Sequence, residues 1–200
     1  MKNEKVMVIH KDILIKHGFV DETGLYTKDT IDIMDAILAD YQFIERENAE
    51  TNFLYKQIIP YVFVTYKDKY LLLRRLSKQT ETRLHGKLSI GVGGHINDDE
   101  KVGSGNIIIS GMYRELNEEV SVSYSKEPVF VGILNNTSSD VSRVHLGIVF
   151  KIEADNEMFE INEKDKMSGE WATLDMLTER FDLLEGWSQV ILSRYMRCDK

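Results

Sequence analysis

The chain has 200 residues, of which 42% are hydrophobic and 29% charged, a balance typical of a globular protein. This length suits one domain with a substantial core, and no apolar run approaches the ~20 residues that a membrane-spanning helix needs. A formal net charge of −8 at pH 7 argues against a nucleic-acid polymer as the main partner, but it leaves room for a small phosphorylated substrate whose charge a metal ion offsets.

The cysteine content and the first residues of the chain bear on where in the cell the protein is expected. Cys198 is the single cysteine, so no internal disulfide can form. Residues 1–12 contain no apolar core followed by a small-residue cleavage site, which predicts no secretion signal. We therefore expect the protein in a reducing cytoplasm, without a membrane partner.

The first part of the chain contains short elements. An apolar stretch at Val6–Ile9 comes first, and Thr30 is placed to cap a helix. Apolar residues after Thr30 recur at helical spacing: Ile31, Met34, Ile37, Leu38 and Tyr41. The polar run Glu45–Asn52 predicts a loop.

This part has enough apolar residues to pack but too few for a core of its own. We expect residues 1–55 to be an N-terminal extension that packs on the main domain, residues 56–200, or on a partner subunit. Because homodimers are the commonest soluble assembly, a homodimer is one expected form.

Strand signals begin after this extension. Ile58–Tyr66 and Tyr70–Arg75 flank a short polar turn, which predicts a hairpin. Pro60 has no amide hydrogen to donate, so we expect it near the strand start or on a sheet edge. Leu88–Val92 predicts another short strand, which ends at Gly93 and Gly94.

A helix is predicted at Asn106–Val120, with Ile107, Ile108 and Met112 on its buried side. Further elements follow in chain order: strands at Val129–Leu134 and Val144–Ile152, joined by the polar loop Asn135–Arg143, and a helix at Ser188–Met196. Strands first, a helix between them and a helix after them predict a mixed α/β sandwich.

Three carboxylates share one face of the helix predicted at 106–120. Glu115, Glu118 and Glu119 lie at positions i, i+3 and i+4, which are neighbours on a helix surface. Like charges at this spacing destabilise a bare helix, so we expect positive charge nearby. Arg114 is one such partner, and a hard divalent cation, which prefers oxygen ligands, is another. The pattern therefore predicts a metal site.

The surrounding segment resembles the Nudix (MutT-type) box, written G-x5-E-x7-R-E-U-x-E-E-x-G-U with U apolar. Its opening is matched by Gly94 and Glu100, and its close by Arg114, Glu115, Leu116, Glu118, Glu119 and Val122. Thirteen residues rather than seven separate Glu100 from Arg114, and Ser121 stands where the box has its last glycine. We expect the inserted residues Lys101–Gly105 to form a surface loop.

The resemblance covers roughly residues 55–195, and residues 83–97 also resemble a bacterial Nudix subfamily described only as predicted phosphoesterases. It implies an α/β (α+β) fold, the Nudix-type α/β/α sandwich with a mixed sheet. It also implies a Mg²⁺-dependent hydrolase, with Mn²⁺ as an alternative ion, that cleaves a diphosphate linkage in a nucleoside diphosphate derivative.

The resemblance also assigns roles to residues. Glu115, Glu118 and Glu119 would bind the metal, and Arg114 would orient a glutamate. Glu100 would be a further metal ligand, although Asn106 occupies the place eight residues before Arg114 and suits a helix cap. Nudix enzymes often take a catalytic base from beyond the box, and the candidates here are Glu160, Glu163 and Glu170.

Several residues near the box are candidates for substrate binding. Gly93 and Gly94 would let the backbone approach the phosphates in a tight turn. Arg83, His85 and Lys87 alternate, so in an extended segment they would point the same way, toward phosphate or toward solvent. The remaining candidates are Arg74 and Arg75, which end a strand, and His95; His145 is expected to be a hydrogen-bonded core residue.

Other functions are compatible with the fold. One is a Nudix-fold sensor that binds a nucleotide without turnover, which the intact Arg-Glu-x-x-Glu-Glu disfavours. The other is an isomerase of the isopentenyl diphosphate type, whose catalytic cysteine has no counterpart, because Cys198 lies far outside the relevant loops.

Overall fold

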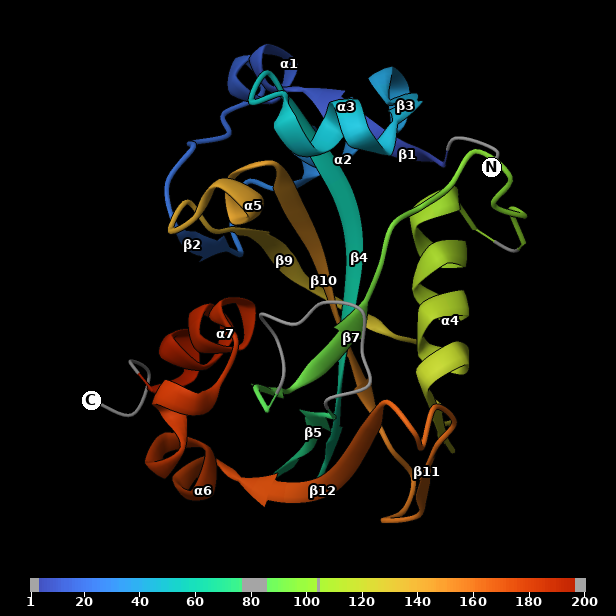
Figure 1. Ribbon diagram of the computed structural model, residues 1–200, viewed down its shortest axis with the longest axis vertical. Helices are drawn as coiled ribbons and strands as arrows, with labels where there is room; N and C mark the ends of the chain where they lie inside the picture. Colours follow the sequence, from blue (N-terminus) through green and yellow to red (C-terminus); the bar gives the residue numbers. More distant parts are fainter. Residues whose placement is uncertain (1–3, 77–85, 104, 197–200) are drawn as a thin grey trace. The chain divides into compact units, whose positions relative to one another are not determined.

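A computed structural model describes residues 4–76, 86–103 and 105–196 (Figure 1). Among these residues, no helix is both long enough and apolar enough to cross a membrane. The chain divides into two compact units, and each is described by itself. Unit 1 comprises Met1–Pro60, Gly94–Gly111 and Val131–Val149, and unit 2 comprises Tyr61–Gly93, Met112–Phe130 and Phe150–Lys200.

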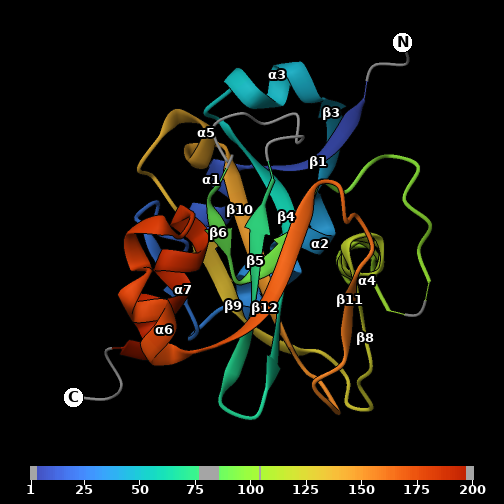
Figure 2. The same ribbon diagram turned by 60° about the horizontal axis from the view of Figure 1, so that its bottom comes forward.

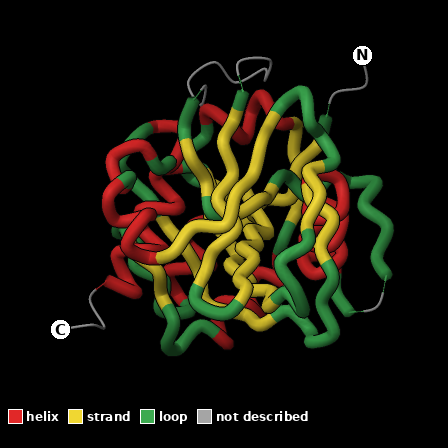
Figure 3. Tube along the Cα trace, turned by 90° about the horizontal axis from the view of Figure 1, so that it is seen from below, coloured by secondary structure: helices red, strands yellow, loops and turns green. Residues whose placement is uncertain are grey.

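Figure 3 shows the helices and strands along the trace, and most of them lie within one of the two units. Unit 1 holds β1 (Lys5–His10), α1 (Lys11–Lys16), β2 (Gly24–Tyr26), α2 (Ile31–Asp40), β3 (Gln42–Glu45), α3 (Arg46–Thr51) and α5 (Asp140–Arg143). Unit 2 holds β5 (Lys69–Arg75), β6 (Leu88–Ser89), β7 (Gly91–Gly93), β8 (Val120–Val122), β11 (Phe159–Ile161), β12 (Met167–Thr173), α6 (Leu174–Glu179), a 3-10 helix (Phe181–Leu183) and α7 (Gly186–Met196). Longer elements contribute residues to both: β4 (Tyr55–Tyr66), α4 (Ile107–Glu119), β9 (Val129–Asn135) and β10 (His145–Glu153).

The strands pair in both directions. In unit 1, β1 pairs antiparallel with β3 and β4, and β2 pairs antiparallel with β9; in unit 2, β5 pairs antiparallel with β4, β6 and β12. Strands β4 and β10 are parallel, because the amide of Gln57 bonds to the carbonyl of Val144 while the amide of Ala154 bonds to the carbonyl of Thr65. The expected mixed sheet is therefore confirmed.

Helices cover both faces of the strands in unit 2. Figures 1 and 2 show α7 on one side of β5 and residues Met112–Glu119 of α4 on the other. Met112 and Leu116 of α4 are buried, and so is Ser188 of α7. The α/β/α sandwich expected from the sequence is confirmed in this arrangement.

The predicted β-hairpin is present. Strands β4 and β5 pair with Thr65 opposite Tyr70 and Tyr66 opposite Lys69, which leaves Lys67 and Asp68 as the turn. Lys67 has a φ of 53°, in the left-handed region that tight hairpin turns require. The other helices predicted at 31–41, 106–120 and 188–196 and the strands at 129–134 and 144–152 are also confirmed, within a few residues at their ends.

Two predictions about local structure are wrong. The polar segment Glu45–Asn52 is not a loop but contains the helix α3. Arg46 binds Glu50 one turn later at 2.9 Å, and Ala49 is buried against Val6 and Val8 of β1, so one small apolar residue and an i,i+4 ion pair stabilise a helix that has no apolar stripe.

The second concerns Pro60, which was expected near the start of its strand or on an edge but lies in the interior of β4. The ladder from β1 ends at Gln57, and the ladder from β7 begins at Tyr61. Pro60 falls between these ladders, where the strand needs no amide donor on that side. Helix α4 approaches closely here, since a methyl group added at Gly111 would lie 3.3 Å from the Cγ of Pro60.

A buried lysine links the N-terminal residues to β4 in unit 1. Lys56 is fully buried, and its Nζ lies 2.8 Å from a carboxylate oxygen of Asp21, 2.9 Å from Oδ1 of Asn135 and 2.7 Å from the carbonyl oxygen of Arg143. Burial opposes ionisation of Asp21, but its bonds with Lys56 and Lys11 lower its pKa to about 2. Three acceptors therefore compensate the buried ammonium group.

The Asp21→Asn variant tests this link. It should lower the free energy of unfolding by about 3 kcal/mol, because Lys56 would stay buried without its counter-charge. In the Asp21→Asn/Lys56→Met double variant, much of that loss should be recovered, since both charges are gone. Chemical denaturation at pH 7 measures both, with Asp12→Asn as an exposed control on α1. Equal stabilities of Asp21→Asn and the wild type would show that Lys56 does not need the pair.

Candidate active site

Helix α4 begins as the sequence indicates. The side chain of Asn106 accepts hydrogen bonds from the amides of Ile108 at 3.0 Å and Ile109 at 3.1 Å, so it caps the helix. Of the inserted segment, the described residues 101–103 and 105 are exposed and lie outside helices and strands. This part of the insertion forms the expected surface loop.

The buried side of α4 fixes the orientation of its carboxylates. Ile107, Ile108 and Met112 are 9%, 0% and 0% exposed, so the predicted buried side is confirmed. Because Glu115 lies three residues beyond Met112, it is also buried, at 9% exposure, whereas the side chain of Glu118 is 55% exposed. The three glutamates share a helix, but their environments differ.

Arg114 contacts its neighbours in this cluster. Its Nη1 donates to Oε1 of Glu115 at 2.7 Å and lies 3.4 Å from both carboxylate oxygens of Glu118. The shorter, charge-assisted bond fixes the orientation of Glu115. The longer contact leaves the exposed Glu118 carboxylate weakly held.

Glu119 is the least compensated carboxylate of α4. Its Oε2 is buried and has no hydrogen-bond partner among the described residues. Burial, opposed by the charge of Arg75 and reinforced by Glu115, Glu163 and Glu185, raises the pKa of Glu119 to about 7. A negative charge at the C-terminal end of a helix is further disfavoured by the helix dipole. The charge of Arg75 therefore compensates the Glu119 carboxylate only in part.

Asn162 joins the end of α4 to the segment that follows β11. Its amide and its side-chain Nδ2 donate to the carbonyl oxygens of Glu119 at 2.9 Å and Asn117 at 2.8 Å, and these are among the carbonyls that a helix end leaves unpaired. Ser121, which replaces the last glycine of the box, lies in β8 and donates to Oδ1 of Asn162 at 2.9 Å. This position is extended strand paired with Glu160, so it does not require glycine.

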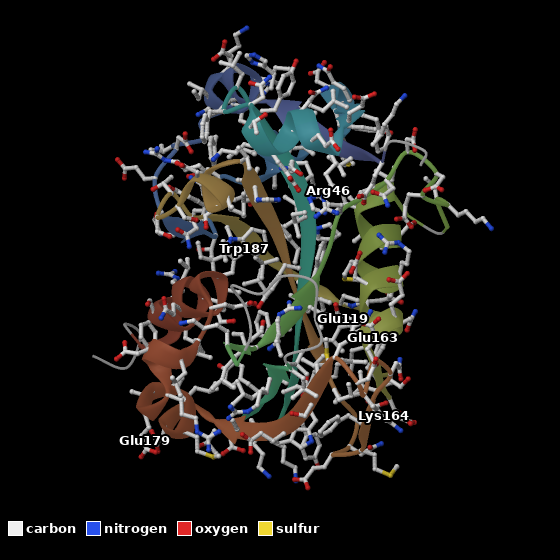
Figure 4. The ribbon with its side chains drawn as sticks, in the orientation of Figure 1. Arg46, Glu119, Glu163, Lys164, Glu179 and Trp187 are labelled. Atoms are coloured by element: carbon white, nitrogen blue, oxygen red, sulfur yellow. The ribbon has the colours of Figure 1, made fainter. Side chains whose placement is uncertain are left out.

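This connection distinguishes the three candidate bases. Glu163 follows Asn162 and lies beside Glu119 in Figure 4; it also holds Lys166 at 2.5 Å. Glu160 is exposed and paired with Lys164, and Glu170 is exposed and paired with Arg180. Of the three, only Glu163 is among the charges that raise the pKa of Glu119.

Some of the residues predicted to bind substrate can be placed in the structure, and others lie outside the described residues. Gly93 ends β7, and neither it nor Gly94 is among the described glycines with positive φ, so the expected tight glycine turn is not present. Lys87 is partly buried, with its Nζ 3.5 Å from the carbonyl oxygen of Asp182. Arg83 and His85 lie outside the described residues.

Glu100, a predicted metal ligand, belongs to unit 1, where its amide bonds to the carbonyl oxygen of Asn97.

The histidines form hydrogen bonds in unit 1. His95 Nε2 lies 2.8 Å from Oε1 of Gln57 and 3.3 Å from Nε2 of His145, whose Nδ1 lies 2.6 Å from the carbonyl oxygen of Val141. Burial, with the charges of Arg46 and His145, lowers the pKa of His95 to about 3, so this ring is neutral at pH 7. These contacts suit a structural role for both rings.

Two residues of unit 2 belong to the candidate site although no sequence motif marks them. Arg75 ends β5 and is the positive charge that most lowers the pKa of Glu119. Glu185 immediately precedes α7, and its Oε2 lies 3.7 Å from Nε of Arg75. The sequence offered Arg74 and Arg75 equally, but Arg74 is exposed. The signal that the sequence contained for Glu185 was its position just before a predicted helix, where acidic residues are common.

The donor atoms suit a hard divalent cation. Within the described ranges, no three His, Cys, Asp or Glu side chains are grouped closely enough to hold a metal ion, so the predicted ligands are not gathered as a set. Yet Glu119 has a buried oxygen without a partner among these residues, and other carboxylates surround it. Carboxylate oxygens are the ligands that Mg²⁺ prefers, and the exposed Glu118 can rotate toward such an ion.

Metal-free stability tests the environment of Glu119. Its pKa is higher in the folded protein than the ordinary value of 4.5, so its contribution to stability is greatest below pH 4.5 and is lost as the pH rises through about 7. In a chelator at pH 8, Glu119→Gln should raise the free energy of unfolding by on the order of 3 kcal/mol, and this gain should shrink toward pH 5.

Melting curves from pH 5 to pH 8 measure this difference, and Glu179→Gln, on the exposed face of α6, is the matched control. A Glu119→Gln variant that melts at or below the wild-type temperature at pH 8 would mean that the carboxylate is already compensated.

Comparisons with known proteins bear on the fold and the family. No family model matches the chain. It is 32% identical over 198 residues to Protein YmaB of Bacillus subtilis (strain 168), which covers 95% of this chain and 96% of that protein. The structure is similar to the crystal structure of Tm1382, described as a candidate Nudix hydrolase, with a TM-score of 0.81 and 29% identity over 98% of this chain and 99% of that one.

A more distant likeness, to a MutT Nudix hydrolase from Burkholderia pseudomallei, has a TM-score of 0.50 and 16% identity over 68% of this chain and 95% of that one, and it supports the fold alone. Together with the near full-length match to Tm1382 and the box residues on α4, the fold shows that the chain belongs to the Nudix hydrolase superfamily.

Proposed function

We propose that this protein is a Mg²⁺-dependent hydrolase that cleaves a diphosphate linkage in a nucleoside diphosphate derivative. The observation that carries the proposal is the buried Glu119 carboxylate, which has an oxygen without a partner among the described residues and lies among other carboxylates. Retaining such a group costs stability, and this cost is explained if a cation binds there during function.

Three glutamates of α4 would hold the ion. Glu115 and Glu119 provide the buried oxygens, and Glu118 provides an exposed carboxylate. Arg114 keeps Glu115 oriented through its 2.7 Å bond. When bound, Mg²⁺ would neutralise charge on phosphoryl oxygens and lower the pKa of a water molecule. Mn²⁺ has similar ligand preferences and could replace it.

Glu163 is our candidate for the general base. It would accept a proton from the water whose oxygen attacks phosphorus, while the bridging P–O bond breaks and the leaving phosphate takes the electron pair. Its position beside Glu119 supports this role, because a base must reach the attacking water. Glu160 and Glu170 are exposed, and neither is among the charges that act on Glu119.

The acidic character of the chain supports a small substrate rather than a nucleic-acid polymer. With a net charge of −8, the protein attracts polyanions weakly, so the metal would provide the positive charge locally. A role in the cytoplasm, where Mg²⁺ and nucleotide derivatives are both available, agrees with the single cysteine.

A substrate panel tests the activity. Nucleotide sugars, dinucleoside polyphosphates, ADP-ribose and nucleoside triphosphates are incubated with the protein and Mg²⁺, and product release is followed by chromatography. We expect turnover of at least one class, abolished by chelator. On that substrate, Glu163→Gln should lower kcat at least about a hundredfold with little change in KM, because proton transfer typically contributes about 10²–10⁴.

Glu160→Gln is the matched control, since it removes a nearby glutamate of β11 that is paired with Lys164. Equal losses in both variants would contradict the assignment of the base. Tight binding of one compound without turnover of any would replace the hydrolase with a nucleotide sensor.

A further inference from the structure

Ser121 stands where the box has its last glycine, and its side chain forms a hydrogen bond that a glycine cannot form. Its Oγ donates to Oδ1 of Asn162 at 2.9 Å, while Nδ2 of Asn162 donates to the carbonyl oxygen of Asn117 at 2.8 Å. Because that carbonyl can only accept, Nδ2 must face Asn117 and Oδ1 must face Ser121. The hydroxyl group of Ser121 therefore provides the donor that this orientation of the amide requires.

Asn162 is also held through its backbone. Its amide donates to the carbonyl oxygen of Glu119, the last residue of α4, at 2.9 Å. Ser121 itself is fixed in β8, where it pairs with Glu160 of β11. Each side-chain bond is exposed and contributes modestly by itself, but together with the backbone bond they hold one residue at three points. Asn162 is therefore tied to the end of α4 through both its backbone and its side chain.

Glu163, the candidate base, follows Asn162 directly in the chain. Its carbonyl oxygen accepts from the amides of Lys166 at 2.8 Å and Met167 at 3.0 Å, so a turn begins at this residue. The backbone of Glu163 is thus fixed by Asn162 on one side and by the turn on the other. Because adjacent Cα atoms are only about 3.8 Å apart, a displacement of Asn162 moves Glu163 with it.

The placement of a general base decides how well it works. A base must come within about 2.6–3.2 Å of the atom whose proton it takes, and a displacement of about 1 Å can cost about a hundredfold in rate. Glu163 lies beside Glu119 in Figure 4, so the bonds of Asn162 help to set the distance between the candidate base and a candidate metal ligand. A change in these bonds should therefore alter proton transfer more than substrate binding.

We propose that Ser121 is a positioning residue, which orients Asn162 so that Glu163 is held beside the end of α4. The inference rests on the proposed hydrolase function and adds to it how a base from outside the box is tied to the box helix. Ser121 acts through Asn162 and Glu163 and not by contact with the substrate. The serine in place of the box glycine thus has a function of its own.

Substitutions of Ser121 and Asn162 test this role in single turnovers of the substrate identified by the panel. Ser121→Ala removes the donor, and it should lower the rate about fivefold with little change in substrate affinity, the size expected for the loss of one hydrogen bond. Ser121→Thr keeps the hydroxyl group and suits a strand, so it should keep the wild-type rate. Asn162→Ala breaks both side-chain bonds and should lower the rate at least about tenfold.

A double-mutant cycle with the base separates positioning from other effects. In a Glu163→Gln background, Ser121→Ala should not lower the rate further, because the group that it positions is gone. The Mn²⁺ affinity of Ser121→Ala, measured by electron paramagnetic resonance, should equal that of the wild type, since the glutamates of α4 remain. Ser125→Ala is the matched control, because it removes another exposed serine bond of unit 2, the 2.8 Å bond to Oδ1 of Asp155, and should keep the wild-type rate.

Equal fractional losses of rate from Ser121→Ala with and without Glu163 would overturn the proposal, because the serine would then act independently of the base. So would a Ser121→Ala variant with a lower melting temperature and an unchanged rate, which would indicate a purely structural role. Wild-type protein that turns over no member of the panel would overturn the proposed function itself, whereas an active wild type with an insensitive Ser121→Ala would overturn only this inference.

Discussion

Burial of the Glu119 carboxylate is the constraint on which the site depends. The group lies at the end of α4, where the helix dipole opposes negative charge, and Glu115, Glu163 and Glu185 add further repulsion. Among the described residues, the charge of Arg75 opposes them. A protein selected for stability alone would replace this side chain with glutamine or an apolar residue, so its presence is best explained by a cation that binds during function.

The surrounding structure keeps the carboxylate in this unfavourable place. Apolar residues of α4 hold the helix against the strands, and Asn162 satisfies carbonyl oxygens at the helix end. The same residue brings Glu163 to Glu119. Packing and backbone hydrogen bonds thus offset the electrostatic cost of the buried carboxylate. The exposed Glu118 is the part of the site that can still adjust.

Sequence and structure agree where a local pattern decides the outcome. The apolar spacing of α4, its Asn106 cap and the β4–β5 hairpin follow from short-range signals, and all were predicted. Helix α3 was missed because it has no apolar stripe, and the burial of Ala49 against β1, which contributes to its stability, depends on residues distant in sequence. Pro60 was misplaced because a residue's position between two ladders depends on which strands pair, and a single sequence does not reveal pairing.

The same distinction applies to the site. The glutamates of α4 carry a motif, so their role was predicted from spacing, whereas Glu163 was only one of three candidates until its backbone neighbour was seen to bond to Glu119. Arg75 and Glu185 are far apart in the chain and meet through the packing of β5, β6 and α7. Long-range contacts of this kind have no local signature in the sequence.

The central claim is that a divalent cation binds beside Glu119. Anomalous diffraction from crystals soaked in Mn²⁺ tests it directly, because the ion scatters anomalously and shares the oxygen ligands of Mg²⁺. Our account predicts an anomalous peak within coordination distance of the Glu115 and Glu119 carboxylates, with Glu118 rotated toward it. Saturating Mn²⁺ with no peak at these residues, or with a peak only at another cluster of carboxylates, would contradict it.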